Sequence, residues 1–183
     1  YTWQILRDFA SFGFCKAHAS AFAMTTYQSA YLKTHHTAAF LAAVLTCEPG
    51  MYPKRLLIDE ARQWGIEILP VDINKSAAGY KVEKVVREKD KYLYTAPNTK
   101  SSGAKLTLPN ATGYGIRVCL ADIAGISVSE IKSIVANRPY TDLADFTYRS
   151  GAHWPTSQVL VEIGAFDLLH GIGIKSKLNR RDL

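Results

Sequence analysis

The feature that most constrains the fold is a stretch without glycine or proline. Residues 17–35 are all compatible with a helix, and Met24, Tyr27 and Tyr31 recur at the spacing that places them on one helix stripe. We therefore expect one helix of about four or five turns over residues 17–35. Aromatic residues at this spacing usually belong to a core, so we expect Tyr27 and Tyr31 to be buried.

Proline and glycine mark the ends of the next elements. Apolar residues at helical spacing predict a second helix over residues 38–46, which ends before Pro49. Pro53 suits the first turn of a third helix, and Gly65 suits the left-handed conformation that ends it. Residues 66–69 then indicate a short strand.

The middle of the chain favours β structure. Runs typical of strands alternate with turn residues, and they cover residues 80–86, 91–95, 105–108 and 115–120. Residues 96–104 have the composition of a loop. We therefore predict a small antiparallel sheet in this part of the chain.

Short helices follow the predicted sheet. Ser127 and Glu130 match the capping box that begins many helices, and Pro139 ends this helix. Two more helices are predicted, one from about residue 141 and one over about residues 157–163. The expected fold class is mixed and mainly α, with a small antiparallel β element.

The composition is that of a globular protein, with 48% hydrophobic and 21% charged residues. The longest apolar stretch, around residues 38–45, is far shorter than the roughly 20 residues that cross a bilayer, so we expect no membrane partner. No signal-peptide pattern opens the chain. C-x-x-C spacing, which would suggest a disulfide framework or a zinc site, is not found among Cys15, Cys47 and Cys119. We expect a cytoplasmic protein.

The net charge of +6 is unevenly distributed along the chain. Residues 80–118 carry +5 and residues 175–183 carry +3, whereas residues 119–174 carry −3. Local positive charge fits contact with a polyanion such as nucleic acid, and solvated surface lysines are the alternative interpretation. We expect the basic tail, residues 175–183, to be frayed.

The sequence contains no pattern that indicates a catalytic or metal-binding centre. The pairs that come nearest are Cys15 with His18, His35 with His36, and Asp142 with Asp145. Adjacent histidines point to different faces of a helix, and paired aspartates suit the positive end of a helix. The cysteine is more often an ordinary small apolar residue than half of a nucleophilic pair. Glycine-rich nucleotide-binding loops are also missing from the sequence. We expect neither catalytic nor metal-ligating residues.

The segment 11–36 (SFGFCKAHASAFAMTTYQSAYLKTHH) resembles the fingers segment of the α subunit of bacterial DNA polymerase III, a family C DNA polymerase. Further similar elements occur in the same order. They are the runs AAFLAA at residues 38–43, residues 59–65, ILPVDINKS at 68–76, the strand at 114–120, the hairpin IAGIS at 123–127, and residues 134–138 and 164–167. The resemblance covers nearly all of residues 3–170.

Two features bear on the branch of this family. The run at residues 49–53 (PGMYP) looks like the error-prone, second-copy branch, and residues 35–37 lack the proline that is usual in replicative members. Lys16 is retained, although the error-prone branch often has an acidic residue there. The sequence favours the error-prone branch and leaves the replicative branch open.

The resemblance implies a division of labour along the chain. Residues 1–79 would form the C-terminal part of the helical fingers, residues 80–118 a small basic β-rich segment with a variable loop, and residues 119–174 a helix-hairpin-helix-like region. The parent would be a magnesium-dependent nucleotidyltransferase whose metal-binding aspartates lie upstream of Tyr1. We therefore expect an excised piece that is inactive alone and holds no cofactor. Primer-template DNA and an incoming nucleotide would be the parent's partners, together with other replication or repair subunits.

The resemblance and the charge together nominate contact residues. Candidates for nucleotide or phosphate binding are Lys16, His18 and Lys33. Candidates for DNA binding are Lys81, Lys84, Arg87, Lys105 and Arg117, with Arg138 by charge alone, and Gly125, the one hairpin glycine that is kept. Tyr27 and Tyr31 could stack on bases if they are not in the core. The rival hypothesis is a protein-interaction module that does not bind DNA.

Overall fold

The computed structural model describes residues 1–13, 15–85, 111–173 and 179–183. Within these ranges the chain is mainly helical with one small sheet, which confirms the expected fold class. The elements are α1 (Thr2–Gly13), α2 (Lys16–His35), α3 (Thr37–Cys47), α4 (Lys54–Gln63), β1 (Glu67–Leu69), β2 (Lys81–Lys84), β3 (Tyr114–Arg117), α5 (Val128–Ala136), α6 (Leu143–Arg149), α7 (Trp154–Glu162) and α8 (Asp167–His170).

The proline and glycine signals place the helix ends correctly. Pro53 is the N-cap of α4 with extended backbone, and Gly65 follows the end of this helix with a φ of 77°. Ser127 and Glu130 form the predicted capping box at the start of α5. Helix α7 begins three residues earlier than predicted, because Pro155 occupies its first turn, where a missing N–H costs nothing.

The sheet is mixed and not purely antiparallel, which corrects the prediction. Its order is β1-β3-β2, in which β2 and β3 are antiparallel as expected while β1 runs parallel to β3. Leu69 of β1 lies opposite Arg117 of β3, 48 positions along the chain, a pairing that no local pattern encodes. The predicted runs at residues 91–95 and 105–108 lie outside the described residues.

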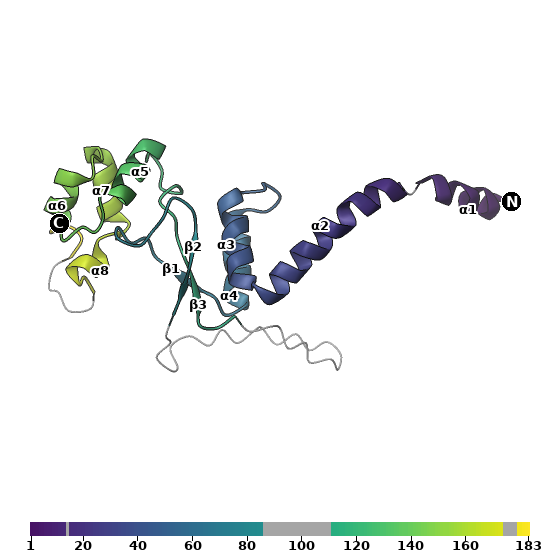
Figure 1. The fold of residues 1–183 in the computed structure, drawn as a ribbon, viewed down its shortest axis with the longest axis horizontal. Coiled ribbons are helices and arrows are strands. Elements are labelled where there is room, and N and C mark those ends of the chain that lie inside the picture. Colours follow the sequence, from purple (N-terminus) through teal and green to yellow (C-terminus); the bar gives the residue numbers. More distant parts are fainter. Residues whose placement is uncertain (14, 86–110, 174–178) are drawn as a thin grey trace.

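Helices α3 and α4 lie on one side of the sheet and α5, α6 and α7 on the other (Figure 1). Each of the two groups has its own hydrophobic core. The first, here called the sheet core, lies between one sheet face and helices α3 and α4. Leu41, Leu45, Ile66 and Ile116 are each at most 2% exposed there. It fixes the position of the α2–α3 junction against β2 and β3.

The second core, here called the helical core, joins α5, α6 and α7 to the chain after β1. Phe146 lies at its centre, and its ring makes edge contacts with Tyr140 at 5.0 Å and Phe166 at 5.1 Å between centroids. All three side chains are at most 2% exposed. Such aromatic pairs add to the stability that burial alone provides.

Asn74 ties the turn after β1 to the chain that leads into α6. Its side chain donates to the Tyr140 carbonyl at 2.9 Å and accepts from the Tyr140 N–H at 2.8 Å. The Asn74 N–H donates to Asp72 Oδ1 at 2.8 Å. Asp72 and Asn74 therefore hold the turn that follows Pro70 through side-chain-to-backbone hydrogen bonds.

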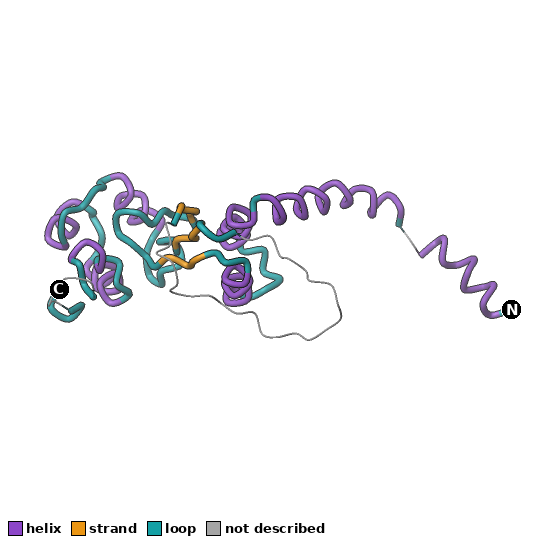
Figure 2. Tube along the Cα trace, turned by 90° about the horizontal axis from the view of Figure 1, so that it is seen from below, coloured by secondary structure: helices purple, strands orange, loops and turns teal. Residues whose placement is uncertain are grey.

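Helix α2 projects away from the rest of the fold, as both ribbon and tube views show (Figures 1 and 2). None of its residues is buried. Tyr27 is 69% and Tyr31 is 48% exposed, so the prediction that they belong to a core is wrong for this chain. Tyr27 and Tyr31 do lie one turn apart on the same helix, but within the described residues no element covers this stripe.

Residues 179–183 fold back onto the helical core, so the prediction of a frayed tail is wrong for this part. The Arg180 guanidinium contacts the Asp167 carboxylate at 2.5 Å, and Leu183 packs against the helical core. Residues 175–178 lie outside the described residues. In the described part of the chain, none of the helices has the length and apolar character needed to cross a membrane.

Candidate nucleic-acid interface

The fingers candidates lie at opposite ends of α2. Lys16 is the first residue of the helix and His18 follows within its first turn, with its ring 4.6 Å from that of Phe22. Lys33 lies about 26 Å further along the helix axis. Its ammonium contacts the Glu60 carboxylate of α4 at 2.5 Å, so its charge is partly neutralised. The structure therefore groups Lys16 with His18 but separates both from Lys33.

The register of β2 and β3 places Lys81 and Lys84 on opposite faces of the sheet. Lys81 pairs with Arg117, and Lys84 pairs with Tyr114. Successive side chains of a strand alternate between faces, so Lys84 shares the face of Val82 and Tyr114, which is turned toward α3. Both lysines are exposed. Because they lie on opposite faces, a DNA strand that lies on one face of the sheet cannot contact both of them. Arg87 and Lys105 lie outside the described residues.

Arg117 is a structural residue in this fold. Its guanidinium donates to both carboxylate oxygens of Glu83, at 2.6 and 2.7 Å, and to the Pro70 carbonyl at 2.8 Å. Hydrogen bonds from Arg117 lower the pKa of the Glu83 carboxyl. The residue is only 4% exposed, so its nomination as a DNA contact has no support from its position.

Arg138 is also turned inward. It donates to the Ser76 carbonyl at 2.6 Å, and its buried Nε has no hydrogen-bond partner among the described residues. Burial lowers the pKa of its guanidinium. A phosphate contact by charge alone is therefore not supported for Arg138.

The hairpin before α5 is open to solvent at Gly125. This glycine has a φ of 86°, and a side chain built on it would meet no atom within 4 Å. Residues 121–125 form only turns, so the first helix of the expected helix-hairpin-helix pattern is reduced to a turn within this part of the structure. The hairpin geometry leaves room for a ligand at Gly125.

The N–H groups next to this hairpin are used internally by the Glu130 carboxylate. Its Oε2 accepts from the Ser127 N–H at 2.9 Å and from the Ser127 hydroxyl at 2.7 Å. Its Oε1 accepts from the His153 N–H at 3.0 Å and from the Thr156 hydroxyl at 2.8 Å. One carboxylate thus serves the first turns of both α5 and α7.

These contacts shift the pKa of Glu130. Burial raises the pKa of this carboxyl, but donation from His153, Ser127 and Thr156 outweighs burial and lowers the pKa to about 2. The carboxylate is therefore charged at neutral pH and occupies the place where a helix start attracts an anion. The Ser127 N–H cannot serve a DNA phosphate without first leaving Glu130.

A polar cluster not predicted from the sequence joins the α4 start to the turn before the hairpin. The Asp122 carboxylate accepts from Lys54 Nζ at 2.6 Å and from the Tyr80 hydroxyl at 2.5 Å, and Lys54 also contacts Glu48. Burial, followed by the hydrogen bond to Asp122, raises the pKa of Tyr80. The partners lie 42 and 68 positions apart, so no motif spacing could have indicated them.

The described residues do not fit a magnesium centre. No three His, Cys, Asp or Glu side chains of the described ranges are grouped so that they could hold a metal ion. The carboxylates of Glu83, Asp122, Asp145 and Asp167 are instead engaged with arginine or lysine.

Comparisons with known proteins identify the wider context. The family model described as "Helix-hairpin-helix motif" matches residues 65–173. The error-prone DNA polymerase of Symbiobacterium thermophilum is 38% identical over 176 residues, which cover 92% of this chain and 16% of that protein. The DNA polymerase III subunit alpha of Chlamydia muridarum is 34% identical over 170 residues, which cover 88% of this chain and 11% of that protein. The error-prone DNA polymerase of Corynebacterium diphtheriae is 31% identical over 177 residues, which cover 96% of this chain and 14% of that protein.

The chain therefore spans only about a sixth or less of the relatives that it matches. The matches to these relatives cover 88–96% of the chain, and the family model alone covers residues 65–173. The chain belongs to the helix-hairpin-helix motif family and is homologous to a region shared by DNA polymerase III alpha subunits and error-prone DNA polymerases.

Proposed function

We propose that this chain is a DNA-contacting part of a bacterial family C DNA polymerase that acts in replication or in error-prone repair synthesis. The observation that carries the proposal is the collinear similarity to proteins named as DNA polymerases, over 92% of the chain in one of them. The local charge of +5 over residues 80–118 supports contact with a polyanion.

Within the polymerase, the start of α2 contacts one part of the substrate, and the sheet and the hairpin contact another. Lys16 and His18, at the start of α2, meet the triphosphate of the incoming nucleotide or a backbone phosphate, because N–H groups and positive charge coincide there. The sheet and the hairpin meet primer-template DNA. Magnesium and the carboxylates that bind it belong to another part of the polymerase, and other replication or repair subunits are further partners. The run at residues 49–53 favours the error-prone branch.

Binding of the chain to primed DNA, measured over a range of salt concentrations, tests this proposal. Each phosphate contact contributes about 0.9 to the slope of log affinity against log salt. We expect Lys84→Ser to reduce the slope by about that amount, since Lys84 is an exposed residue of the basic segment, residues 80–118. Lys132→Ser, an exposed lysine of α5 within the acidic region, is the matched control and leaves the slope unchanged.

The same measurement compares the sheet with the hairpin. Gly125→Val places a side chain on a backbone with positive φ and without neighbouring atoms, and it changes the slope by at most about one contact. The reverse ranking, in which the hairpin variant loses more slope than the lysine variant, would contradict the expectation that the basic segment supplies more of the DNA contact than the hairpin. We expect no primer extension by the chain alone with magnesium and nucleotides.

A second candidate function is a protein-interaction module, and the exposed apolar side chains of α1 and α2 favour it. Trp3 is 78%, Phe22 is 58% and Met24 is 64% exposed. Apolar surface of this kind is typical of a contact with other protein. Under this alternative the chain binds no DNA even at low salt. The measurement of binding to primed DNA over a range of salt concentrations therefore distinguishes the two functions.

A further inference from the structure

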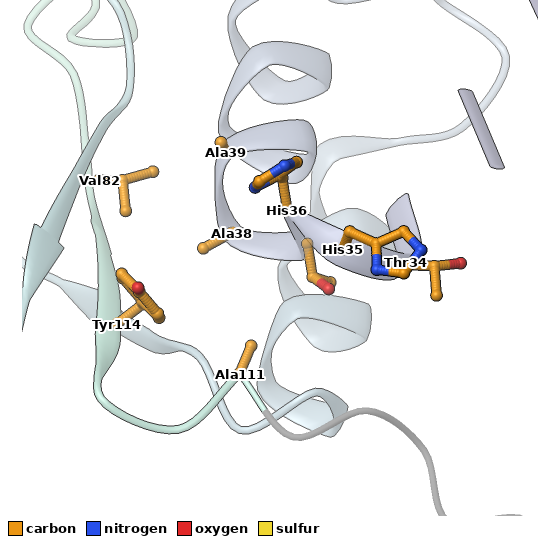
Figure 3. Close-up of a pocket in the computed structure, with 9 residues that line it drawn as sticks. Thr34, His35, His36, Ala38, Ala39, Val82, Ala111 and Tyr114 are labelled. Atoms are coloured by element: carbon orange, nitrogen blue, oxygen red, sulfur yellow. The ribbon is translucent and has the colours of Figure 1, made fainter. Parts of the chain in front are cut away.

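A pocket opens between the α2–α3 junction and the face of the sheet that carries Lys84. Its volume is about 220 Å³. His36, Ala38 and Ala39 line it from the helix side, and Val82, Ala111 and Tyr114 line it from the sheet side (Figure 3). In Figure 3 the Tyr114 side chain extends from the strand toward α3, and the His36 ring lies beside the start of α3.

The sequence of these elements explains why the pocket is open. His36 breaks the helix between α2 and α3, with a non-helical backbone of φ −133° and ψ 46°. Across from it, Tyr114 is 43% exposed, whereas Ile116 on the same face of β3 is fully buried in the sheet core. Ala38 and Ala39 line the pocket from α3, and their small side chains take up little of its space.

The chemistry of the lining suits a flat ring that carries an anionic group. Two aromatic rings and small apolar side chains form the walls, and none of the nine lining residues is acidic. Lys84 lies directly opposite Tyr114 across the β2–β3 pair, so its side chain is on the same face within about 5 Å between Cβ atoms. His35 also lines the pocket, and its ring contacts that of Tyr31 in a tilted arrangement, with 4.3 Å between ring centroids.

The size of the pocket limits the ligand further. Pockets for drug-sized molecules and cofactors have volumes of about 300–1,000 Å³. A pocket of about 220 Å³ is too small for these and suits a single ring system. Bases of single-stranded nucleic acid stack on aromatic side chains while basic groups hold the backbone, which is the combination of groups found here.

We propose that this pocket binds one unpaired nucleobase of a DNA strand, stacked against Tyr114 and His36, with the adjoining phosphate beside Lys84. This rests on the proposed function, because it names how one part of the DNA is held. It assigns a site to Tyr114, His36 and Ala39, which the sequence did not nominate.

The test compares two fluorescent single strands that differ only in their bases. One is a short oligothymidylate, and the other has the same length and phosphates but abasic sites in place of the thymidines. At one salt concentration we expect the chain to bind the base-containing strand about tenfold more tightly. Phosphate contacts are the same in both strands, so this ratio isolates the base.

Variants locate the effect at the pocket. Tyr114→Ala removes one wall and Ala39→Leu fills the space from an exposed position of α3, so both reduce the ratio toward one. Tyr114→Phe keeps the ring and the ratio. Tyr148→Ala is the matched control, because Tyr148 is 91% exposed on α6 and lies outside the pocket, and it leaves the ratio unchanged. Circular dichroism of each variant checks the fold.

Three results would overturn the inference. The first is equal affinity for both strands, and the second is a ratio that survives both Tyr114→Ala and Ala39→Leu. The third is that free thymidine monophosphate binds in a way that depends on Tyr114, while the chain shows no preference for the base-containing strand. The ligand of the pocket would then be a free nucleotide and not a base of a DNA strand. Failure of the proposed function is distinguishable, because the chain would then bind neither strand nor primed DNA at any salt concentration.

Discussion

Replacing Glu130 by glutamine tests how one buried carboxylate holds two helix starts together. Glu130 is 6% exposed, and its carboxylate accepts from the N–H groups of both Ser127 and His153. A glutamine side chain has the same shape but only one acceptor oxygen. Its NH₂ group must therefore face one of the two backbone N–H groups, which loses its partner.

Two routes give the size of the effect. An unsatisfied buried N–H costs about 1–3 kcal/mol. The pKa of Glu130 is lowered from 4.5 to about 2, and a difference of one pKa unit corresponds to about 1.4 kcal/mol, which gives about 3 kcal/mol. We expect Glu130→Gln to lower the free energy of unfolding by about 2–3 kcal/mol at neutral pH.

Urea denaturation at about pH 7 and about pH 3 measures this difference. The folded-state pKa lies below the unfolded value, so the stabilisation is present above about pH 4.5 and is lost as the pH falls toward 2. The gap between wild type and Glu130→Gln should therefore shrink to roughly 1 kcal/mol at about pH 3.

Glu162→Gln provides the control, since Glu162 is an exposed glutamate near the end of α7. It should cost less than about 0.5 kcal/mol at either pH. An equal loss for both variants at neutral pH, or a Glu130→Gln loss that does not depend on pH, would refute the shared-carboxylate reasoning.

Three more substitutions follow from the same structure. Arg117→Ala leaves the half-buried Glu83 carboxylate and the Pro70 carbonyl without their donor, and urea denaturation should show a loss of about 1–3 kcal/mol. Phe146→Ala empties the centre of the helical core and should cost about 3–5 kcal/mol in the same assay, with reduced near-ultraviolet circular dichroism. Lys16→Ala should leave the denaturation curve of the chain unchanged, since Lys16 is exposed, but should lower kcat/KM for nucleotide in the full polymerase. An unchanged kcat/KM would make Lys16 an ordinary surface charge.

The local elements could be predicted from the sequence because their signals are local. Pro53, Gly65 and the Ser127–Glu130 box each act within one helix turn, and all three lie where expected. The parallel pairing of β1 with β3 could not be predicted, since it brings together strands separated by β2 and residues 86–110. The exposure of Tyr27 could not be predicted either, because helical spacing shows which residues share a stripe but not whether another element covers it.

The candidate site was predictable in part. The sequence located the positive charge, but charge alone does not separate Lys84, which is exposed, from Arg117, which is held by Glu83 from 34 positions away. The pocket beside Tyr114 depends on a helix break and a strand register that meet only in the folded chain. The capping box was recognised, but the second half of the Glu130 contacts comes from α7.

The absence of buried residues in α2 has a consequence for cooperativity. Helices in water gain most of their stability from packing, and a helix of 20 residues without a buried face is marginal by itself. Amide hydrogen exchange should therefore be graded along α2, fastest near Lys16 and slower near Lys33, where the contact with Glu60 and the junction with α3 hold the helix. Helix α2 would then unfold from its Lys16 end in a separate step, while the two cores unfold together.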